Sequence, residues 1–154
     1  MTFKKHKLVL IGEQGVGKST ILSLLQGRKD LKKRKVTIGV AIEEVYVDDS
    51  KVACWDLGGQ DRFKFMWADF MRGAGTMVLV TDSTEENLQE TKEIYERYNR
   101  FQGSKVIAIA NKQDKSGALH PQKIANELGI KTYAMCAINP VNRSTIEQIL
   151  RQEV

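Results

Sequence analysis

The stretch GEQGVGKST, residues 12–20, joins an apolar run to a leucine-rich segment. Gly12, Gly17, Lys18 and Ser19 have the spacing of a phosphate-binding loop between a strand and a helix. Glycines let the backbone curl so that successive N–H groups face phosphate oxygens, and the start of the helix adds its positive dipole end. Lys18 would neutralise the β- and γ-phosphates, and the Ser19 hydroxyl would ligate Mg²⁺. Because the loop follows a strand pattern and opens a helix pattern, it predicts a nucleoside triphosphate site rather than a glycine-rich turn.

The apolar pattern around this loop alternates between short strands and longer helices. Strands are expected at 7–11, 40–47, 51–57, 76–82, 105–111 and 131–137. The polar stretch 48–50 between two of them predicts a hairpin, whereas the most apolar runs favour central parallel strands. The prediction is an α/β fold of the P-loop NTPase type. It has a mostly parallel six-stranded sheet with one antiparallel edge strand and about five flanking helices, in one domain spanning 1–154.

Three pairs of residues predict where helices begin and end. The first two pairs have the spacing of a capping box, and the third combines a proline at a helix start with a glycine at its end. The pairs are Ser83 with Glu86, Ser144 with Glu147, and Pro121 with Gly129.

The charge balance of the chain is basic, with a net charge of +5 that is concentrated in Lys4–Lys7 and Arg28–Lys35. Such clusters are able to contact nucleic acid, an acidic partner or anionic lipid. No aromatic residues are interleaved with them and no nucleic-acid-binding module is recognisable, so a solvated basic face is favoured and no nucleic-acid partner is expected. Membrane association is expected to be weak at most and sensitive to salt.

Several features favour a cytoplasmic protein. No apolar stretch is long enough to cross a bilayer, position 2 is Thr2 rather than glycine, and the chain ends RQEV, so lipidation is not predicted. Cys54 and Cys136 lie in apolar runs and are expected to be free thiols.

Three further polar stretches follow expected strands or precede them: TIG at 37–39, WDLGGQ at 55–60 and NKQD at 111–114. With the phosphate-binding loop, they make the sequence resemble the small GTPases of the Ras superfamily. The WDLGGQ and NKQD stretches, and Trp67 seven residues after Gln60, are most similar to the Arf-like branch. FMRGAG at 70–75 is more similar to Rab and Ras proteins. The resemblance runs along the whole chain and implies GTP or GDP with Mg²⁺ as ligands.

The resemblance implies a guanine site at the NKQD stretch. Asp114 would accept hydrogen bonds from guanine, and adenine offers no donors there, so ATP would leave the carboxylate unpaired. Asn111 would bind the base and brace the phosphate loop, the stem of Lys112 would pack on the ring, and the Ala137 N–H would meet guanine O6. The neighbouring Cys136 and Ile138 differ from the Ser-Ala-Lys that the family often has. The implied nucleotide-binding set is Glu13, Gln14, Gly15, Val16, Gly17, Lys18, Ser19, Thr20, Thr37, Gly59, Asn111, Lys112, Asp114, Cys136, Ala137 and Ile138.

The resemblance also implies a metal site and a switch. Ser19, Thr37 and Asp56 would hold Mg²⁺, with Thr37 joining only when a γ-phosphate is present, and the Gly59 N–H would contact that phosphate. Loss of the γ-phosphate would release both segments. Gln60 would orient the attacking water while Lys18 absorbs charge, at rates on the order of 10⁻⁴ to 10⁻² per second in relatives, so the chain is expected to act as a timer.

Two residues depart from the family pattern. Gln14 stands where an arginine finger from a partner would enter, and its bulk disfavours activation in trans of the Ras type. Arg34 lies three residues before Thr37, a spacing similar to that of the built-in arginine of heterotrimeric G-protein α-subunits. Our hypothesis is that Arg34 acts in cis as a catalytic residue; the alternative is that it belongs to a solvated basic run.

The segment after Gln60 is rich in aromatic residues. Half of them are expected to pack on the sheet, and the remainder would form a contact patch that depends on the bound nucleotide. Phe63, Phe65 and Trp67 are the predicted contacts for effector, exchange and activating proteins.

The leading interpretation is a GTP-hydrolysing molecular switch in membrane traffic or signalling. One alternative is a scaffold that binds GTP permanently and does not hydrolyse it. A second is a small ATP-dependent P-loop enzyme such as a kinase, which the NKQD stretch disfavours.

Overall fold

The computed structural model describes residues 2–28, 30–31, 37–99 and 104–154. Within them the chain forms a six-stranded sheet with the order β2-β3-β1-β4-β5-β6. Only β2 runs antiparallel to its neighbour β3, and all other adjacent pairs are parallel, which confirms the predicted fold class. The strands are β1 (Lys4–Ile11), β2 (Val40–Val47), β3 (Ser50–Leu57), β4 (Thr76–Thr81), β5 (Lys105–Ala110) and β6 (Thr132–Ala134).

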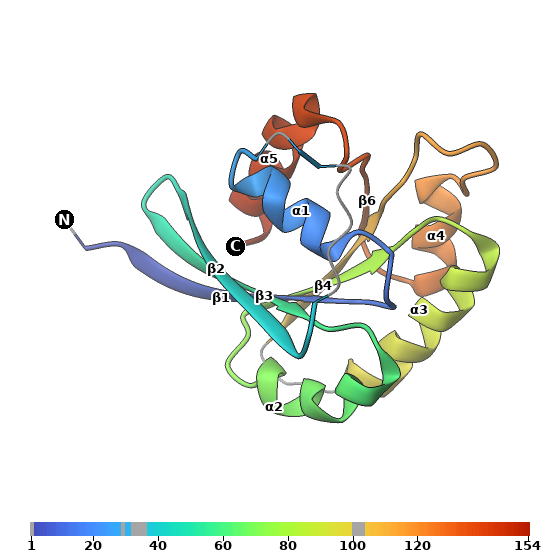
Figure 1. Cartoon of the computed structure of the whole chain (residues 1–154), viewed down its shortest axis with the longest axis horizontal. Coiled ribbons are helices and arrows are strands. Elements are labelled where there is room, and N and C mark those ends of the chain that lie inside the picture. The colour runs from blue at the N-terminus through green and yellow to red at the C-terminus, as the bar shows by residue number, and fades with distance from the viewer. Residues whose placement is uncertain (1, 29, 32–36, 100–103) are drawn as a thin grey trace.

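Helices cover both faces of the sheet (Figure 1). One face packs against α1 and α5, and the other packs against α2, α3 and α4. The helices in the described ranges are α1 (Lys18–Leu25), α2 (Trp67–Met71), α3 (Glu85–Tyr98), α4 (Pro121–Leu128) and α5 (Arg143–Glu153), with the short 3-10 helices η1 (Asp61–Met66) and η2 (Pro140–Asn142).

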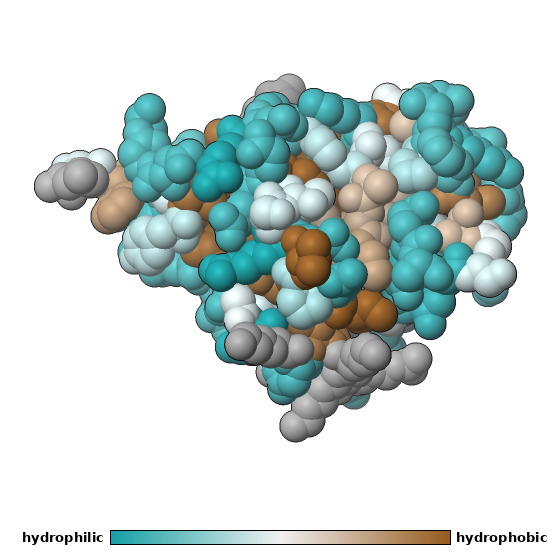
Figure 2. Space-filling model, turned by 90° about the horizontal axis from the view of Figure 1, so that it is seen from above, coloured by the Kyte–Doolittle hydropathy of each residue, from teal (hydrophilic) through white to brown (hydrophobic). Residues whose placement is uncertain are grey.

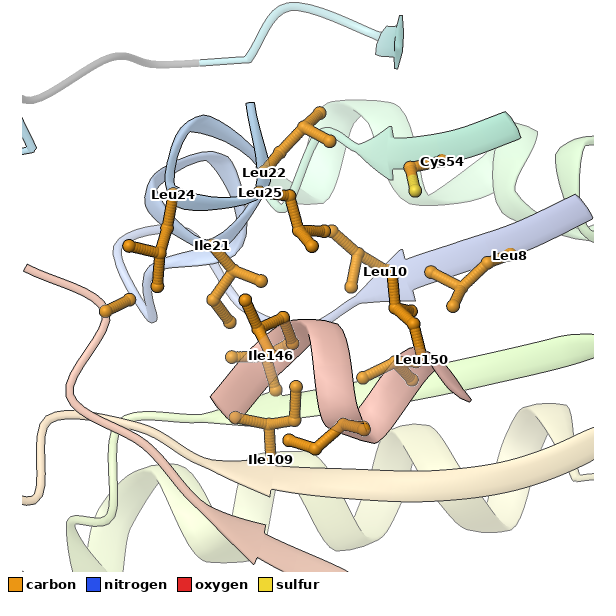
Figure 3. Packing of buried hydrophobic residues seen from close by; sticks show 14 of the residues in the cluster. Leu8, Leu10, Ile21, Leu22, Leu24, Leu25, Cys54, Ile109, Ile146 and Leu150 are labelled. Carbon is orange, nitrogen blue, oxygen red and sulfur yellow. The ribbon is translucent and has the colours of Figure 1, made fainter. Parts of the chain in front are cut away.

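The apolar run of β1 is explained by burial on both of its faces. Leu8 and Leu10 point toward α1 and α5, and they belong to one buried cluster with Leu25 and Leu150 (Figure 3). Alternate residues of the same strand, such as Val9, point into the second core. A central parallel strand between two helical layers has no solvated face, so its sequence lacks the polar alternation of an edge strand.

The predicted capping box at Ser83 and Glu86 is wrong by one residue. The cap of α3 is Thr84, whose hydroxyl accepts a hydrogen bond from the Asn87 backbone N–H at 3.1 Å. Ser83 is fully buried in a left-handed conformation, and its hydroxyl donates instead to the Asn111 carbonyl at 2.6 Å. The Ser83 hydroxyl is thus used in a tertiary hydrogen bond, and the adjacent Thr84 hydroxyl caps the helix.

The capping box predicted at Ser144 and Glu147 is also wrong. Helix α5 already begins at Arg143, and the Ser144 hydroxyl donates backward to the Val141 carbonyl at 3.4 Å. Glu147 pairs with Arg143, one turn away.

The start of α4 at Pro121 and its end at Gly129 are confirmed. Gly129 has a φ of 72°, which glycine adopts without the steric cost that other residues incur. The last strand, in contrast, ends at Ala134, three residues before the predicted limit, because 135–137 leave the sheet to form a loop beside the NKQD stretch.

Both cysteines are free thiols. Cys54 lies inside β3, and its burial raises the pKa of the thiol to about 12. The face of the molecule that carries α1 and α5 is mostly hydrophilic, with hydrophobic side chains visible between the polar ones (Figure 2). Over the described ranges, none of the helices has both the length and the apolar composition needed to span a bilayer.

Candidate functional site

The candidate site lies at the carboxyl ends of the parallel strands. The loop after β1, the loop after β3, the NKQD loop after β5 and the loop after β6 all emerge at this edge. Hydrogen bonds of Asn111 link the loops after β1, β5 and β6. Ligands bind at this edge in open α/β sheets because the loops that meet there are not needed to close the core.

The phosphate-binding loop runs from Gly12 to Gly17, directly before α1. Gly17 has a φ of 109°, and a Cβ atom there would collide with the side-chain amide of Asn111. That amide donates a hydrogen bond to the Val16 carbonyl at 2.9 Å. Glycine at position 17 therefore allows both the loop conformation and the close approach of Asn111.

Lys18 is the buried cation of this loop, with 6% of its surface exposed. Its ammonium group donates to the carbonyls of Gly12 and Glu13 at 3.0 and 3.1 Å. Burial lowers the pKa of Lys18 to about 8, although the charges of Asp56 and Glu13 oppose this shift. A buried cation inside a curled loop is suited to an anionic ligand that would compensate its loss of hydration.

Asp56 gathers the two hydroxyls that were predicted to join it. Its Oδ2 atom accepts from Ser19 at 2.5 Å and from Thr37 at 3.0 Å, and the two hydroxyls are 2.7 Å apart. Oδ1 is buried without a hydrogen-bond partner among the described residues, and burial raises the pKa of Asp56 against the effects of Ser19, Lys18 and Thr37. One carboxylate and two hydroxyls are hard oxygen donors, so the set fits Mg²⁺. A cavity of about 280 Å³ opens beside these three side chains.

Asn111 links the phosphate loop to the loop after β6. It is 3% exposed, and its Oδ1 atom accepts a hydrogen bond from the Ala137 N–H at 3.1 Å while its amide holds Val16. The bracing of the phosphate loop by Asn111 is thus present in the structure. The Ala137 N–H, which was expected to meet guanine, is engaged by Asn111.

Lys112 and Asp114 complete the NKQD loop. Lys112 has a φ of 61°, and its ammonium donates to the Gly15 carbonyl at 2.6 Å. Asp114 is exposed, and the Cys136 thiol is hydrogen-bonded to its carboxylate. Burial and this contact raise the pKa of Cys136, so the thiol stays protonated and serves as a donor to Asp114.

Gln60 and Gly59 lie on the opposite side of the phosphate loop. Gln60 is half-buried, and its Oε1 atom accepts a hydrogen bond from Arg62 Nε at 2.8 Å. A cavity of about 310 Å³ next to these residues is also lined by Glu13 and Gln14. Arg34, the predicted cis arginine, lies outside the described residues.

The predicted aromatic patch needs a correction at Trp67. Phe65 is 78% exposed and Phe63 is half-buried, but Trp67 is fully buried. Its ring packs against Tyr98 with centroids 5.5 Å apart, and its N–H donates to the Gly58 carbonyl at 3.0 Å. The indole is therefore part of the core in this conformation and is not a surface contact.

Lys64 belongs to the site although nothing in its sequence context predicts this. This residue of η1 forms an ion pair with Glu13 of the phosphate loop. The only signal in the sequence is the opposite charge of two residues separated by 51 positions, and many other pairs in this charged chain share it. The tertiary structure was needed to find the contact.

Comparison with known proteins agrees with this geometry. The sequence profile of the ADP-ribosylation factor family matches residues 1–150. The chain belongs to the ADP-ribosylation factor family. It is 30% identical to ADP-ribosylation factor J of Dictyostelium discoideum over 84% of this chain and 70% of that protein. It is 31% identical to ADP-ribosylation factor-like protein 1 of Saccharomyces cerevisiae over 82% and 71%, and 29% identical to ADP-ribosylation factor-like protein 5 of Caenorhabditis elegans over 84% and 74%.

Membership in the ADP-ribosylation factor family confirms the resemblance to the Arf-like branch of the small GTPases. It supports a GTP-binding switch in membrane traffic, with GTPase activity in general and with GTP or GDP and Mg²⁺ as its ligands. It also supports regulators and effectors as protein partners in general.

Proposed function

We propose that this chain is a molecular switch that binds GTP, hydrolyses it slowly to GDP, and changes the conformation of its 37–39 and 59–66 segments to control partner binding. The observation that carries the proposal is the meeting of Ser19, Thr37 and Asp56 beside the buried Lys18. Three side chains from three separate segments line one cavity there, and Lys18 is buried in the adjoining phosphate-binding loop.

Each of these residues has a role toward the triphosphate. Lys18 would exchange its bonds to the Gly12 and Glu13 carbonyls for bonds to β- and γ-phosphate oxygens. Ser19, Thr37 and Asp56 would hold Mg²⁺, which neutralises phosphate charge when bound. The unpartnered Oδ1 of Asp56 supports this role, because a buried carboxylate oxygen needs a cation or a donor.

The base would bind at the loop containing Asp114. Its exposed carboxylate is free to accept from the N1–H and amino groups of guanine, while the Cys136 thiol orients it. Lys112 would pack its stem on the ring, and Ala137 with Ile138 would line the other side. Asn111 would contact the base from its position between the two loops.

In the hydrolytic step, the oxygen of a water attacks the γ-phosphorus and the bond from that phosphorus to the bridging oxygen breaks, which yields GDP and inorganic phosphate. Gln60 would orient the water through its side-chain amide, and Lys18 would stabilise the charge on the transferred group. Gln60 must first give up its hydrogen bond to Arg62. This requirement supports a low intrinsic rate.

The γ-phosphate would also hold the 37–39 and 59–66 segments. The Thr37 hydroxyl and the Gly59 N–H would both be ordered around it, and its loss would release them. Effector, exchange and activating proteins would then distinguish the two states through the exposed Phe65 and the half-buried Phe63. We keep Arg34 as a hypothetical cis residue, to be tested by single-turnover hydrolysis of Arg34→Ala.

Nucleotide selectivity tests the proposal. Isothermal calorimetry of the purified chain with Mg²⁺ should show GTP binding at least about 10⁴-fold more tightly than ATP, because ATP leaves the Asp114 carboxylate without donors. Asp114→Ala should remove most of this preference and leave the phosphate contacts in place. Asp49→Ala, at the turn between β2 and β3 and 64% exposed, is the matched control. Equal affinity of the natural chain for GTP and ATP would refute the proposal.

The hydrogen bond from Arg62 to Gln60 also supports the second candidate, a scaffold that holds GTP without hydrolysing it. The two candidates differ in the product released by GTP-loaded protein. A switch yields GDP and phosphate in the natural chain and much less in Gln60→Leu. A scaffold yields neither product in either protein.

A further inference from the structure

The ion pair between Glu13 and Lys64 joins the phosphate-binding loop to η1. Each side chain is only 20% exposed, whereas a surface pair such as Lys123 with Glu85 is 50% and 63% exposed. Charges that are mostly withdrawn from water are screened less by salt, so this pair holds its two segments together more firmly than a surface pair does.

Lys64 is held in place from several sides. Its ammonium group pairs with Asp61 at 2.9 Å and lies 5.7 Å from the centroid of the Trp67 ring. Its backbone carbonyl accepts a hydrogen bond from the Tyr98 hydroxyl at 3.4 Å. Burial lowers the pKa of Lys64, but the hydrogen bonds with Glu13 and Asp61 raise it by more than burial lowers it. The pKa is therefore above its ordinary value, and the group remains charged at neutral pH. Contacts other than Glu13 therefore already restrict the rotamers of the Lys64 side chain.

A second contact joins the same two segments a few residues earlier. A Cβ atom at Gly59 would come within 2.5 Å of the Gln14 nitrogen and within 2.7 Å of the Gly12 carbonyl oxygen. The backbone at Gly59 is thus packed directly on the phosphate-binding loop. Gln60 lies between this contact and the ion pair, so both ends of its segment are fixed to the loop that would hold the γ-phosphate.

We propose that the Glu13–Lys64 pair is a latch that holds residues 59–66 against the phosphate-binding loop, and that Lys64 is thereby a positioning residue for Gln60. The positioning role rests on the proposed GTPase function, but the latch itself does not. A catalytic group that is misplaced by about 1 Å loses much of its effect, so freeing one end of the segment lowers the rate of hydrolysis. Lys64 acts through Gln60 and has no contact with substrate in this assignment.

Hydrogen–deuterium exchange tests the latch directly. Amide exchange of 59–66 is compared between the natural protein and Lys64→Gln, first without nucleotide and then with a non-hydrolysable GTP analogue. Loss of the latch should speed exchange in this segment by about tenfold through local opening. Lys123→Gln removes one partner of the exposed pair on α4 and should leave exchange in 59–66 unchanged. Equal exchange in the natural protein and Lys64→Gln would overturn the latch.

Single-turnover hydrolysis tests the positioning role. Lys64→Gln should hydrolyse bound GTP about fivefold more slowly while its affinity for GTP stays within about twofold, because only the placement of Gln60 changes. Lys64→Arg keeps the charge and should restore most of the rate. An unchanged rate in Lys64→Gln would overturn the positioning role.

The double variant shows whether the two residues act as one unit. If they do, the double variant Glu13→Gln with Lys64→Gln hydrolyses GTP no more slowly than the slower single variant. Effects that multiply in the double variant would show that the two residues act independently and would overturn the pair as one unit. Should the natural protein fail to hydrolyse GTP at all, the proposed function and the positioning role are both refuted, and the exchange measurement still decides the latch.

Discussion

Two buried carboxylates lie at opposite edges of the sheet, and their surroundings differ. Asp56, at the nucleotide edge, is 1% exposed and leaves one oxygen without a partner among the described residues. Glu153, at the end of α5, is 6% exposed and accepts a hydrogen bond from Tyr133 at 2.5 Å and ion pairs from Lys131 at 3.1 Å and Lys105 at 3.4 Å.

The two pKa values shift in opposite directions for this reason. Burial raises the pKa of both carboxyls, and at Asp56 it outweighs the neighbouring hydroxyls and Lys18. At Glu153 the hydrogen bonds from Tyr133, Lys131 and Lys105 outweigh burial and lower the pKa. A carboxylate whose partners all belong to the chain stabilises the fold, whereas one with an unpartnered oxygen is prepared for a ligand. Substitutions at the two edges should accordingly affect different measurements.

The largest effect on binding is expected at the edge where we propose that the nucleotide binds. Lys18→Met should weaken GTP binding by about 10² to 10³-fold, because the buried cation that we propose as the phosphate contact is lost. Isothermal calorimetry measures the affinity, and thermal unfolding without nucleotide should change far less than binding does. An affinity within about threefold of the natural protein would contradict the division between the two edges.

Substitution of Trp67 tests whether this residue, which follows the loop after β3, is part of the hydrophobic core. Trp67→Ala should lower the free energy of unfolding by about 3–5 kcal/mol, because a fully buried indole and its hydrogen bond to Gly58 are removed. Urea denaturation gives the value. Phe65→Ala is the matched control, since that ring is 78% exposed and should leave stability nearly unchanged. Equal losses in the two variants would mean that Trp67 is not part of the core in solution.

Glu153→Gln should lower stability by about 2 kcal/mol at neutral pH, because a buried charged acceptor is lost, and should leave GTP affinity unchanged. The pKa of Glu153 is lowered by folding, so its contribution is complete above the ordinary carboxyl pKa and disappears as the pH falls through the lower folded value. Urea midpoints between neutral and acidic pH should therefore converge for the two proteins on acidification. A gap that persists in strong acid would show that the loss is steric.

The smallest effect is expected for Lys105→Gln, at about 0.5 kcal/mol or less. The side chain of Lys105 is 53% exposed, and Glu153 keeps Lys131 and Tyr133 when Lys105 is neutralised. Thermal unfolding alongside Glu153→Gln provides the comparison. A loss as large as that of Glu153→Gln would mean that the carboxylate depends on this one lysine.

Features that depend on local spacing were predictable from the sequence. The phosphate-binding loop, the hairpin of β2 and β3, and the limits of α4 each follow from neighbouring residues with fixed conformational preferences. The grouping of Ser19, Thr37 and Asp56 was implied by the family resemblance, and the topology accounts for it. Ser19 follows β1 and Asp56 lies near the end of the parallel strand β3, while Thr37 precedes β2, which is antiparallel and begins at that same edge.

Features that depend on tertiary contacts were not predictable in this way. Ser83 and Thr84 are chemically similar, and only the position of the Asn111 carbonyl decides which of them caps α3. The burial of Trp67 and the pairing of Glu13 with Lys64 likewise depend on where α2, α3 and η1 pack. The sequence alone does not show which hydroxyl caps α3, whether Trp67 is buried, or which residue pairs with Glu13.

Asn111 fixes two loops of the site relative to each other. Its single amide holds Val16 on one side and Ala137 on the other, so the two halves of the pocket form one rigid frame when the chain folds. A ligand that binds to a preformed site orders little additional backbone. The conformational entropy of the two loops is lost when the chain folds and not when the ligand binds. Affinity for the phosphates at one loop would thereby be coupled to selectivity for the base at the other.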